Sequence, residues 1–277
     1  MNSIQIFDRT LLQLRRDRTI INNYNCNFLF EETAKRLLDR LNDIRHDFPI
    51  IADIGCHNGE IGTLLQNRND IKRLYQMDIS YEYARRAKIK NNFLSIVGDE
   101  EFLPFADESL NLILSNLSMH WVNDLPGMLI QIYRALKHDG LFLGCMFGGE
   151  TLKTLHEILI SAEIEEENVL SPRVSPFIDI ATAGQLLQRS YFSFPVVDID
   201  NLIIDYPNAM DLMRDLSHMG ESNLLVKRSK NFTKRKILTR ACELYQKSYG
   251  DKNKRIKANF QVLYLTGWVQ KNKIKKY

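Results

Sequence analysis

Two glycines and an aspartate have the spacing of a nucleotide-binding turn. Gly55 and Gly59 belong to the run Asp53-Ile-Gly-Cys-His-Asn-Gly59, and Asp78 closes the next apolar run, roughly 20 residues later. Glycine lacks a Cβ and tolerates positive φ, so the backbone of such a turn can approach a ligand closely. A carboxylate at the end of the second strand can accept hydrogen bonds from both ribose hydroxyls of an adenosine. The spacing therefore predicts an adenosine-containing cofactor between the turn and Asp78.

The same turn has other interpretations. A doubly wound sheet can carry a glycine after its first strand and an acid after its second for structural reasons alone. A dinucleotide fold requires G-x-G-x-x-G, whereas His57 takes the central position here and Gly62 completes only part of the pattern. We interpret His57 as a solvated turn residue in preference to a ligand of the cofactor's polar end.

A histidine and a tryptophan follow the fourth predicted strand, where the acceptor pocket of such a fold lies. His120 could take or orient a proton during group transfer, or it could simply pack beside its neighbour. Trp121 is expected to line the substrate pocket, because an indole offers stacking area and a single donor.

Later residues supply further candidates for the substrate pocket. Gly148 and Gly149 follow a strand and could admit a substrate backbone, with a plain loop as the alternative. His218 and Glu221 lie around Gly220 in a region with the character of a lid. Near the beginning of the chain, a basic helix face is interpreted as solvated surface in preference to a docking face; its members are Arg9, Arg15, Arg16 and Arg18.

Composition narrows the class of protein. The 277 residues include 37 basic and 34 acidic side chains, a balance unlike that of a dedicated nucleic-acid binder. No segment approaches the roughly 20 apolar residues of a membrane span. Four separated cysteines give no disulfide framework, and the six histidines show no compact triad, so no metal site is predicted. We expect a cytoplasmic protein.

The elements that position these residues alternate as βαβ units. Short apolar runs at 48–54, 72–77, 93–97, 110–115 and 141–147 predict strands, and charged stretches such as 81–90 and 125–137 predict helices between them. Two helices precede this sheet, helices are expected at 150–167, 179–189 and within 208–249, and strands at 195–206 and 259–269. The predicted organisation is a helical segment 1–46, a main domain 47–270 with helical insertions at about 150–192 and 207–250, and a basic tail 271–277.

Four runs together, 53–59, 78–80, 98–107 and 110–121, resemble class I methyltransferases of the biotin-synthesis type. The resemblance implies a Rossmann-like α/β fold, with a seven-stranded, mostly parallel sheet whose last strand is antiparallel, and S-adenosyl-L-methionine over the strand ends. It also implies that Asp99 contacts the adenine amino group, although an aspartate after a strand can equally cap a turn. The cofactor-binding residues implied are Asp53, Gly55, Cys56, Gly59, Asp78, Ile79, Asp99, Glu100 and Asn116.

A wider set of blocks is similar to the arginine-hydroxylase complex I assembly factor 5 family; the blocks are 6–9, 118–126, 146–151, 171–177 and 215–223. This resemblance implies hydroxylation or methylation of an arginine in the respiratory complex I subunit that carries the terminal iron–sulfur cluster. It also implies transient association with the periphery of the inner membrane. Hydroxylation requires an oxidant that the sequence does not reveal. Two alternatives stay open: a carboxyl O-methyltransferase acting on a carrier-bound or small substrate, and a non-catalytic complex I assembly chaperone.

Overall fold

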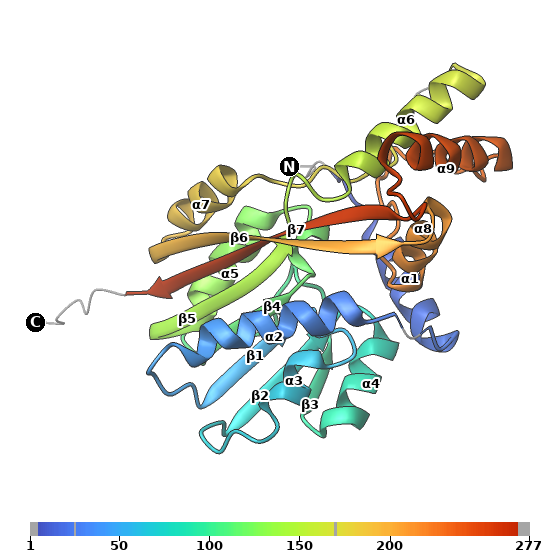
Figure 1. The fold of residues 1–277 in the computed structure, drawn as a ribbon. Helices are drawn as coiled ribbons and strands as arrows, with labels where there is room; N and C mark the ends of the chain where they lie inside the picture. The colour runs from blue at the N-terminus through green and yellow to red at the C-terminus, as the bar shows by residue number, and fades with distance from the viewer. Residues whose placement is uncertain (1–4, 25, 169–170, 271–277) are drawn as a thin grey trace, which may run out of the picture. The chain divides into compact units, whose positions relative to one another are not determined.

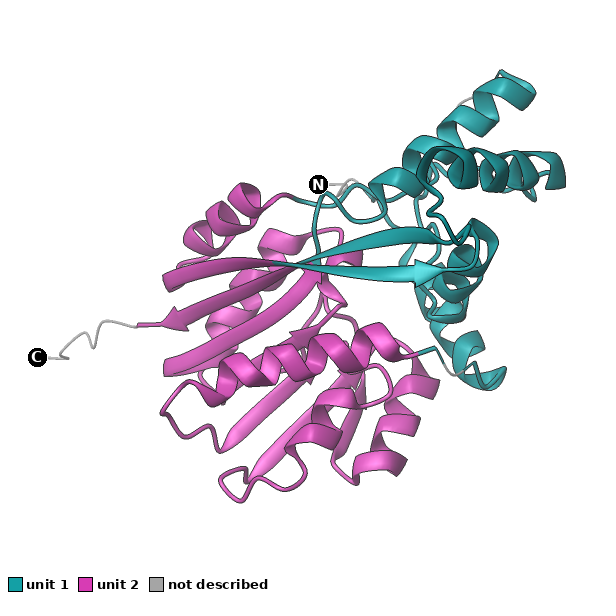
Figure 2. Ribbon diagram, viewed as in Figure 1, with its two compact units in different colours: residues 1–26, 147–178, 200–262 teal, residues 27–146, 179–199, 263–277 magenta. Residues whose placement is uncertain are grey.

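The computed structural model describes residues 5–24, 26–168 and 171–270 and separates into two compact units (Figure 2). Unit 1 contains residues 1–26, 147–178 and 200–262, and unit 2 contains residues 27–146, 179–199 and 263–277. The predicted domain boundaries differ from these divisions and stay predictions, and the predicted basic tail lies outside the described residues.

A seven-stranded sheet with the order β3-β2-β1-β4-β5-β7-β6 organises the fold (Figure 1). Its strands are β1 (Ile50–Ile54), β2 (Arg73–Asp78), β3 (Leu94–Val97), β4 (Leu110–Asn116), β5 (Leu136–Phe147), β6 (Ser193–Tyr206) and β7 (Ile256–Val269). The pairs β1–β2, β2–β3, β1–β4 and β4–β5 are parallel, and Asp53 aligns with Gln76 on one side and Leu114 on the other. The arrows of β6 and β7 point in opposite directions in Figure 1. The predicted seven-stranded α/β fold is confirmed.

The order of the strands creates the position for a ligand. The chain moves outward from β1 to β2 and β3, then returns to place β4 on the other side of β1. At such a reversal the turns after neighbouring strands diverge, which leaves a crevice at the carboxyl ends of the strands. The turn after β1 and the end of β4 both lie there.

Helices in unit 2 bury apolar faces against this sheet. They are α2 (Phe28–Asn42), α3 (Glu60–Leu65), α4 (Tyr81–Asn91), α5 (Leu125–Ala135) and α7 (Ile180–Arg189), with a short 3-10 turn η1 (Met119–Trp121). The buried side chains of α2 recur at helical spacing and include Leu29, Phe30, Leu37, Leu38 and Leu41. Capping agrees with the sequence, because Ser80 begins α4 by accepting a hydrogen bond from the N–H of Tyr83 at 3.1 Å.

The described part of unit 1 combines four helices with parts of β6 and β7. It contains α1 (Arg9–Ile21), α6 (Lys153–Glu167), α8 (Ala209–His218) and α9 (Arg235–Tyr249). Arg16 in α1 is only 1% exposed, so the prediction of a wholly solvated basic face is wrong at that position. Arg15 on the same helix donates to the carbonyl of Asn223 at 2.8 Å. Arg15 and Arg16 therefore help to pack this unit.

Some predicted bounds differ from the observed ones. The strand expected at 141–147 begins at Leu136, and the strand expected at 259–269 begins at Ile256. The helical region 208–249 holds two helices, α8 and α9. The helix expected from Glu150 begins at Lys153 because the preceding residues form a turn, in which the Thr151 N–H donates to the Gly148 carbonyl at 2.9 Å.

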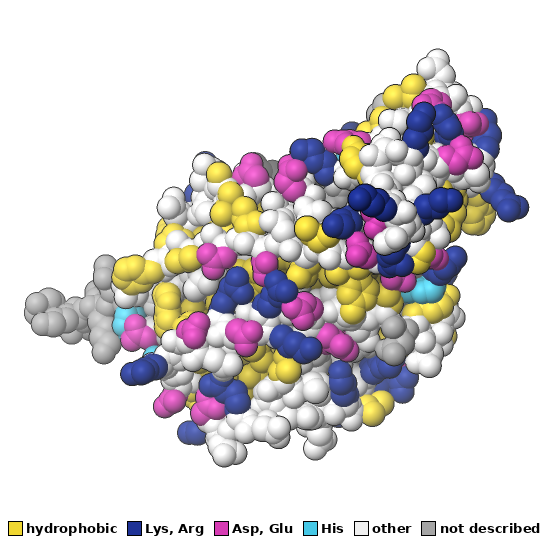
Figure 3. All heavy atoms as spheres, viewed as in Figure 1, with side chains coloured by type: hydrophobic (Ala, Val, Ile, Leu, Met, Phe, Trp, Pro, Cys, Tyr) yellow, Lys and Arg dark blue, Asp and Glu magenta, His cyan; other side chains and the backbone are white. Residues whose placement is uncertain are grey.

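No helix in the described part of the chain is long and apolar enough to cross a membrane. On the face in Figure 3, basic and acidic side chains are interspersed, as the near balance of charge suggests.

Candidate functional site

The turn after β1 leaves no room for side chains at its glycines. Gly55 has φ +70°, and a Cβ there would lie 2.2 Å from the Oγ of Ser118. Gly59 has φ +75°, and its carbonyl accepts a hydrogen bond from the Nδ2 of Asn91 at 2.7 Å. Both positions therefore require glycine, as the sequence predicts.

His57 is a buried part of this turn, so its interpretation as a solvated residue is wrong. The side chain is 1% exposed and stacks on Phe30 of α2 with ring centroids 4.1 Å apart. Its Nε2 lies 3.0 Å from the carbonyl oxygen of Asn116, so this nitrogen carries the proton that the carbonyl accepts. The imidazole thus links α2, the turn and the end of β4.

The acid at the end of β2 is held by backbone donors. Asp78 is fully buried, and its Oδ2 accepts from the N–H of His57 at 3.1 Å. Its Oδ1 accepts from the N–H of Ser80 at 2.9 Å. Ile79, which lies between Asp78 and Ser80 in the chain, is buried as well. The carboxylate is oriented toward the turn that precedes α3, beside which a ribose is expected.

Asp53 is the most unusual group of the turn. It is 0% exposed, and neither carboxylate oxygen receives a hydrogen bond from any described residue. Burial raises the pKa of Asp53 well above the usual range for aspartate, and repulsion from Glu60 and Asp78 adds to the shift. An unsatisfied buried carboxylate costs free energy, so its presence beside a glycine turn favours a cationic ligand group.

Glu60, the first residue of α3, is a second buried carboxylate that the sequence analysis missed. Burial raises its pKa to about 7, and the Lys90 ammonium and the backbone amide of Glu60 itself partly oppose the shift. Its only signal in the sequence is its place directly after Gly59, which says nothing about burial.

The remaining predicted cofactor residues make contacts within unit 2. Ser118 donates to Glu100 at 2.6 Å beneath Gly55, and the Oδ1 of Asp99 accepts from the N–H of Glu101 at 2.9 Å. The Asn116 side chain accepts from Thr33 at 2.8 Å and donates to the carbonyl of Phe30 at 2.8 Å. The side chain of Asn116 thus anchors α2 to β4.

Cys56 follows Gly55 in the same turn. Its N–H donates to the carbonyl of Met77 at 2.9 Å, which joins the turn to β2. The thiol is buried.

His120 and Trp121 lie in η1, just after β4. They are 4% and 2% exposed, and their ring centroids are 4.9 Å apart. The structure therefore brings them to the same end of the sheet as the glycine turn, in unit 2.

The other predicted substrate residues belong to unit 1. The N–H of Gly148 donates to the Gln261 carbonyl at 2.8 Å, and that of Gly149 to the Ile178 carbonyl at 3.1 Å. His218 stacks on Tyr24 with centroids 3.9 Å apart, and Glu221 is buried. The predicted site residues of unit 2 thus cluster around the glycine turn, whereas the other predicted substrate residues lie at separate positions in unit 1. Among the described residues, no group of three or more His, Cys, Asp or Glu could hold a metal ion.

Comparison with known proteins agrees with this geometry. Residues 52–144 match the family described as methyltransferase domain. A solved putative methyltransferase from Bacillus halodurans has the same fold, with a TM-score of 0.61 and 12% identity over 87% of this chain and 100% of that one. The fold and the turn define a class I methyltransferase-like enzyme.

Sequence relatives assign the family. The protein named arginine-hydroxylase NDUFAF5, mitochondrial, of Danio rerio is 38% identical over 96% of this chain and 83% of its own length. The chain belongs to this arginine-hydroxylase family. The malonyl-[acyl-carrier protein] O-methyltransferase of Xylella fastidiosa is a more distant relative, 28% identical over 89% of this chain and 83% of its own.

The expected cytoplasmic location is contradicted by the arginine-hydroxylase relatives. Their names describe them as mitochondrial in organisms as distant as Danio rerio and Dictyostelium discoideum. The prediction depended on four unpaired cysteines, which the structure also has. Unpaired cysteines indicate a reducing environment, and that criterion does not distinguish one reducing compartment from another.

Proposed function

We propose that the chain binds S-adenosylmethionine at the turn after β1 and modifies an arginine of a respiratory complex I subunit during assembly, the subunit that carries the terminal iron–sulfur cluster. The observation that carries the cofactor proposal is the buried carboxylate of Asp53, to which no described residue donates a hydrogen bond. Arginine is proposed as the modified residue because the relatives that align with 96% of the chain are named arginine-hydroxylases.

The residues present fit this cofactor. Asp53 offers two free acceptor oxygens for the ammonium group of the cofactor. Gly55 has no Cβ, so the backbone of the turn can approach the cofactor closely. Asp78 takes the ribose hydroxyls and Asp99 the adenine amino group. A bound S-adenosylmethionine supplies an activated methyl group, and the protein contributes alignment, which can lower a barrier by about 7 to 11 kcal/mol.

His120 and Trp121 are proposed to form the acceptor side of the site. His120 takes or orients a proton of the acceptor, and Trp121 forms a wall against which a planar guanidinium can stack. Gly148, Gly149, His218 and Glu221 are proposed to contact the substrate protein.

Methylation and hydroxylation of arginine differ in the atoms they add and in the reactants they consume. Methylation forms a nitrogen–carbon bond, breaks the sulfonium–carbon bond and releases one proton. Hydroxylation adds one oxygen atom and consumes an external oxidant. The mass of the product therefore identifies the reaction.

A second function, methyl transfer to a carboxylate, is supported by the similarity to the malonyl-[acyl-carrier protein] O-methyltransferase of Xylella fastidiosa. Ester formation adds the same mass as N-methylation but is labile to mild base, whereas a methylated guanidinium is stable. Base treatment distinguishes the two.

Two measurements test the proposal in sequence. The first is thermal unfolding with S-adenosylmethionine, which at 100 times its dissociation constant adds about 2.7 kcal/mol of stability. The second is peptide mass spectrometry of the cluster-bearing complex I subunit from cells with and without this gene. An arginine that gains oxygen or a methyl group only when the gene is present supports the proposal. Identical spectra with retained cofactor binding contradict it and favour a small-molecule substrate or a non-catalytic assembly role.

A further inference from the structure

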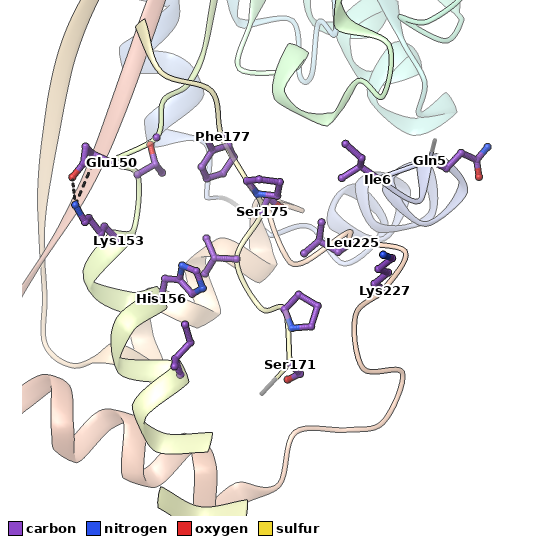
Figure 4. A pocket seen from close by; sticks show the side chains of 16 residues that line it. Gln5, Ile6, Glu150, Lys153, His156, Ser171, Ser175, Phe177, Leu225 and Lys227 are labelled. Carbon is purple, nitrogen blue, oxygen red and sulfur yellow. Dashed lines mark hydrogen bonds and ion pairs between the residues drawn. The ribbon is translucent and has the colours of Figure 1, made fainter. Parts of the chain in front are cut away.

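We propose that a cavity within unit 1 binds an amphiphilic monoanion, a carboxylate attached to an apolar chain. The cavity has a volume of about 860 Å³ and lies among the start of α6, segment 171–177, Ile6 and the residues around Leu225 (Figure 4). That volume is within the range of roughly 300 to 1,000 Å³ that small-molecule sites occupy. This proposal goes beyond the modification of arginine.

The wall of the cavity is mainly apolar. Figure 4 shows Ile6, Leu225 and Phe177 around the open space, with His156 on the side opposite Ile6. The apolar side chains that line it include Ile6, Ile160, Pro172, Val174, Phe177 and Leu225. An acyl chain would leave water on entering this space, which supplies the main driving force for binding.

The charged groups around the cavity favour an anion. Lys153 pairs with Glu150 at 3.0 Å, so these two charges compensate each other. Lys227 also lines the cavity, and no described residue accepts a hydrogen bond from its ammonium or pairs with it. Counting Lys and Arg against Asp and Glu, one positive charge therefore remains among the described lining residues.

Polar groups without hydrogen-bond partners among the described residues also line the cavity. Ser175 is 7% exposed and lines the cavity, and its hydroxyl has no hydrogen-bond partner among the described residues. The ring of His156 likewise forms no hydrogen bond with any described residue. Helix α6 begins here at Lys153 without a side-chain cap on its first N–H groups. A carboxylate that enters the cavity could accept a hydrogen bond from the Ser175 hydroxyl or from the first N–H groups of α6.

The same charges exclude the arginine of the proposed reaction as the occupant. A guanidinium would meet Lys227 and Lys153, and the one carboxylate that lines the described cavity, that of Glu150, is already paired. Arginine recognition instead requires free acceptors, which the charged side chains lining the described cavity do not supply. The cavity is thus a site for a different ligand.

Isothermal titration of the full chain with decanoate and decylammonium, both below their micelle concentrations, tests the proposal. We expect one decanoate per chain, bound at least about tenfold more tightly than decylammonium, because a charge-assisted contact replaces a repulsive one. Failure of decanoate to bind, or equal affinities for the two, would overturn the proposal.

Variants locate the site. Lys227→Met is expected to weaken decanoate binding about tenfold and Ser175→Ala by a smaller factor, whereas Lys230→Met, an exposed lysine three residues away that does not line the cavity, leaves it unchanged. Val174→Trp fills the space and should abolish binding in a protein that still unfolds cooperatively. Equal effects of the two lysine variants, or full binding by a folded Val174→Trp protein, would place decanoate elsewhere and refute the proposal. Measurements without S-adenosylmethionine keep this outcome independent of the proposed function.

Discussion

The backbone N–H of His57 donates to the Oδ2 of Asp78 at 3.1 Å, so the turn after β1 and the end of β2 share one carboxylate. The other oxygen of Asp78 accepts from the N–H of Ser80, which begins α4. A single buried acid therefore orients two segments on either side of the expected ribose position.

Asp78→Asn should remove cofactor binding and also weaken the fold. An amide keeps one acceptor oxygen but presents an NH₂ group to the second backbone N–H, which costs about 1 to 3 kcal/mol. Urea unfolding with and without S-adenosylmethionine measures both effects. As a control, Asp107→Asn breaks an exposed pair with Arg134 and should change stability by less than about 1 kcal/mol. Full stabilisation of Asp78→Asn by the cofactor would contradict the assignment.

Asp53→Asn should lower the affinity for S-adenosylmethionine without lowering the stability of the free protein. The amide removes a buried charge that no donor stabilises, so the free protein should not lose stability above neutral pH. Affinity for S-adenosylmethionine should fall at least about tenfold, because the contact with its ammonium loses its charge. Calorimetric titration checks this, with Asp39→Asn on the exposed face of α2 as the matched control. Equal affinity in both variants would remove Asp53 from the cofactor site.

Gly55→Ala should destabilise the protein by more than about 2 kcal/mol, since it combines a positive φ with overlap against Ser118. Denaturant unfolding provides the measurement. Adding Ser118→Gly should recover the part of the lost unfolding free energy that is due to overlap, but not the part that is due to the positive φ. Gly184→Ala in α7, where a Cβ meets nothing within 4 Å, should instead stabilise by about 0.5 to 1 kcal/mol. A neutral Gly55→Ala would show that the turn adapts.

Stability of the free protein should depend on pH through Glu60. Its folded pKa of about 7 is above the unfolded value of 4.5, so the native state binds the proton more tightly. The stability present at low pH is therefore lost as pH rises from the unfolded pKa through about 7, by an amount on the order of 3 kcal/mol. Glu60→Gln should flatten this part of the profile, whereas Asp39→Asn should not. An unchanged slope in Glu60→Gln would contradict the raised pKa.

His120→Ala should leave the affinity for S-adenosylmethionine near its normal value and lower the yield of modified arginine. The reason is that His120 is assigned to the acceptor side of the site, after β4. Titration with the cofactor and mass spectrometry of the substrate subunit are the two readouts. Normal yield in the variant would remove His120 from the mechanism, and restored yield in His120→Gln would assign it to positioning.

The sequence by itself determined the α/β fold, the glycine turn and the place of Asp78. Each of these depends on local information: apolar runs with the period of a buried strand, punctuation by glycine, and an acid at one βαβ step from the turn. The positive φ at Gly55 and Gly59 is of this kind, because the tight turn itself demands it, whereas the overlap of a Cβ at Gly55 with Ser118 depends on the fold.

Only the tertiary structure decided which polar residues are buried and which remain without partners. His57 is enclosed because Phe30, distant in the chain, packs on its ring, and Asn116 is occupied by Thr33 and Phe30 of the same helix. The unsatisfied carboxylate of Asp53 and the cavity beside Lys227 arise in the same way, from segments that meet only in the folded chain. Burial is a property of the neighbours that folding brings together, and the spacing of residues along the chain does not encode it.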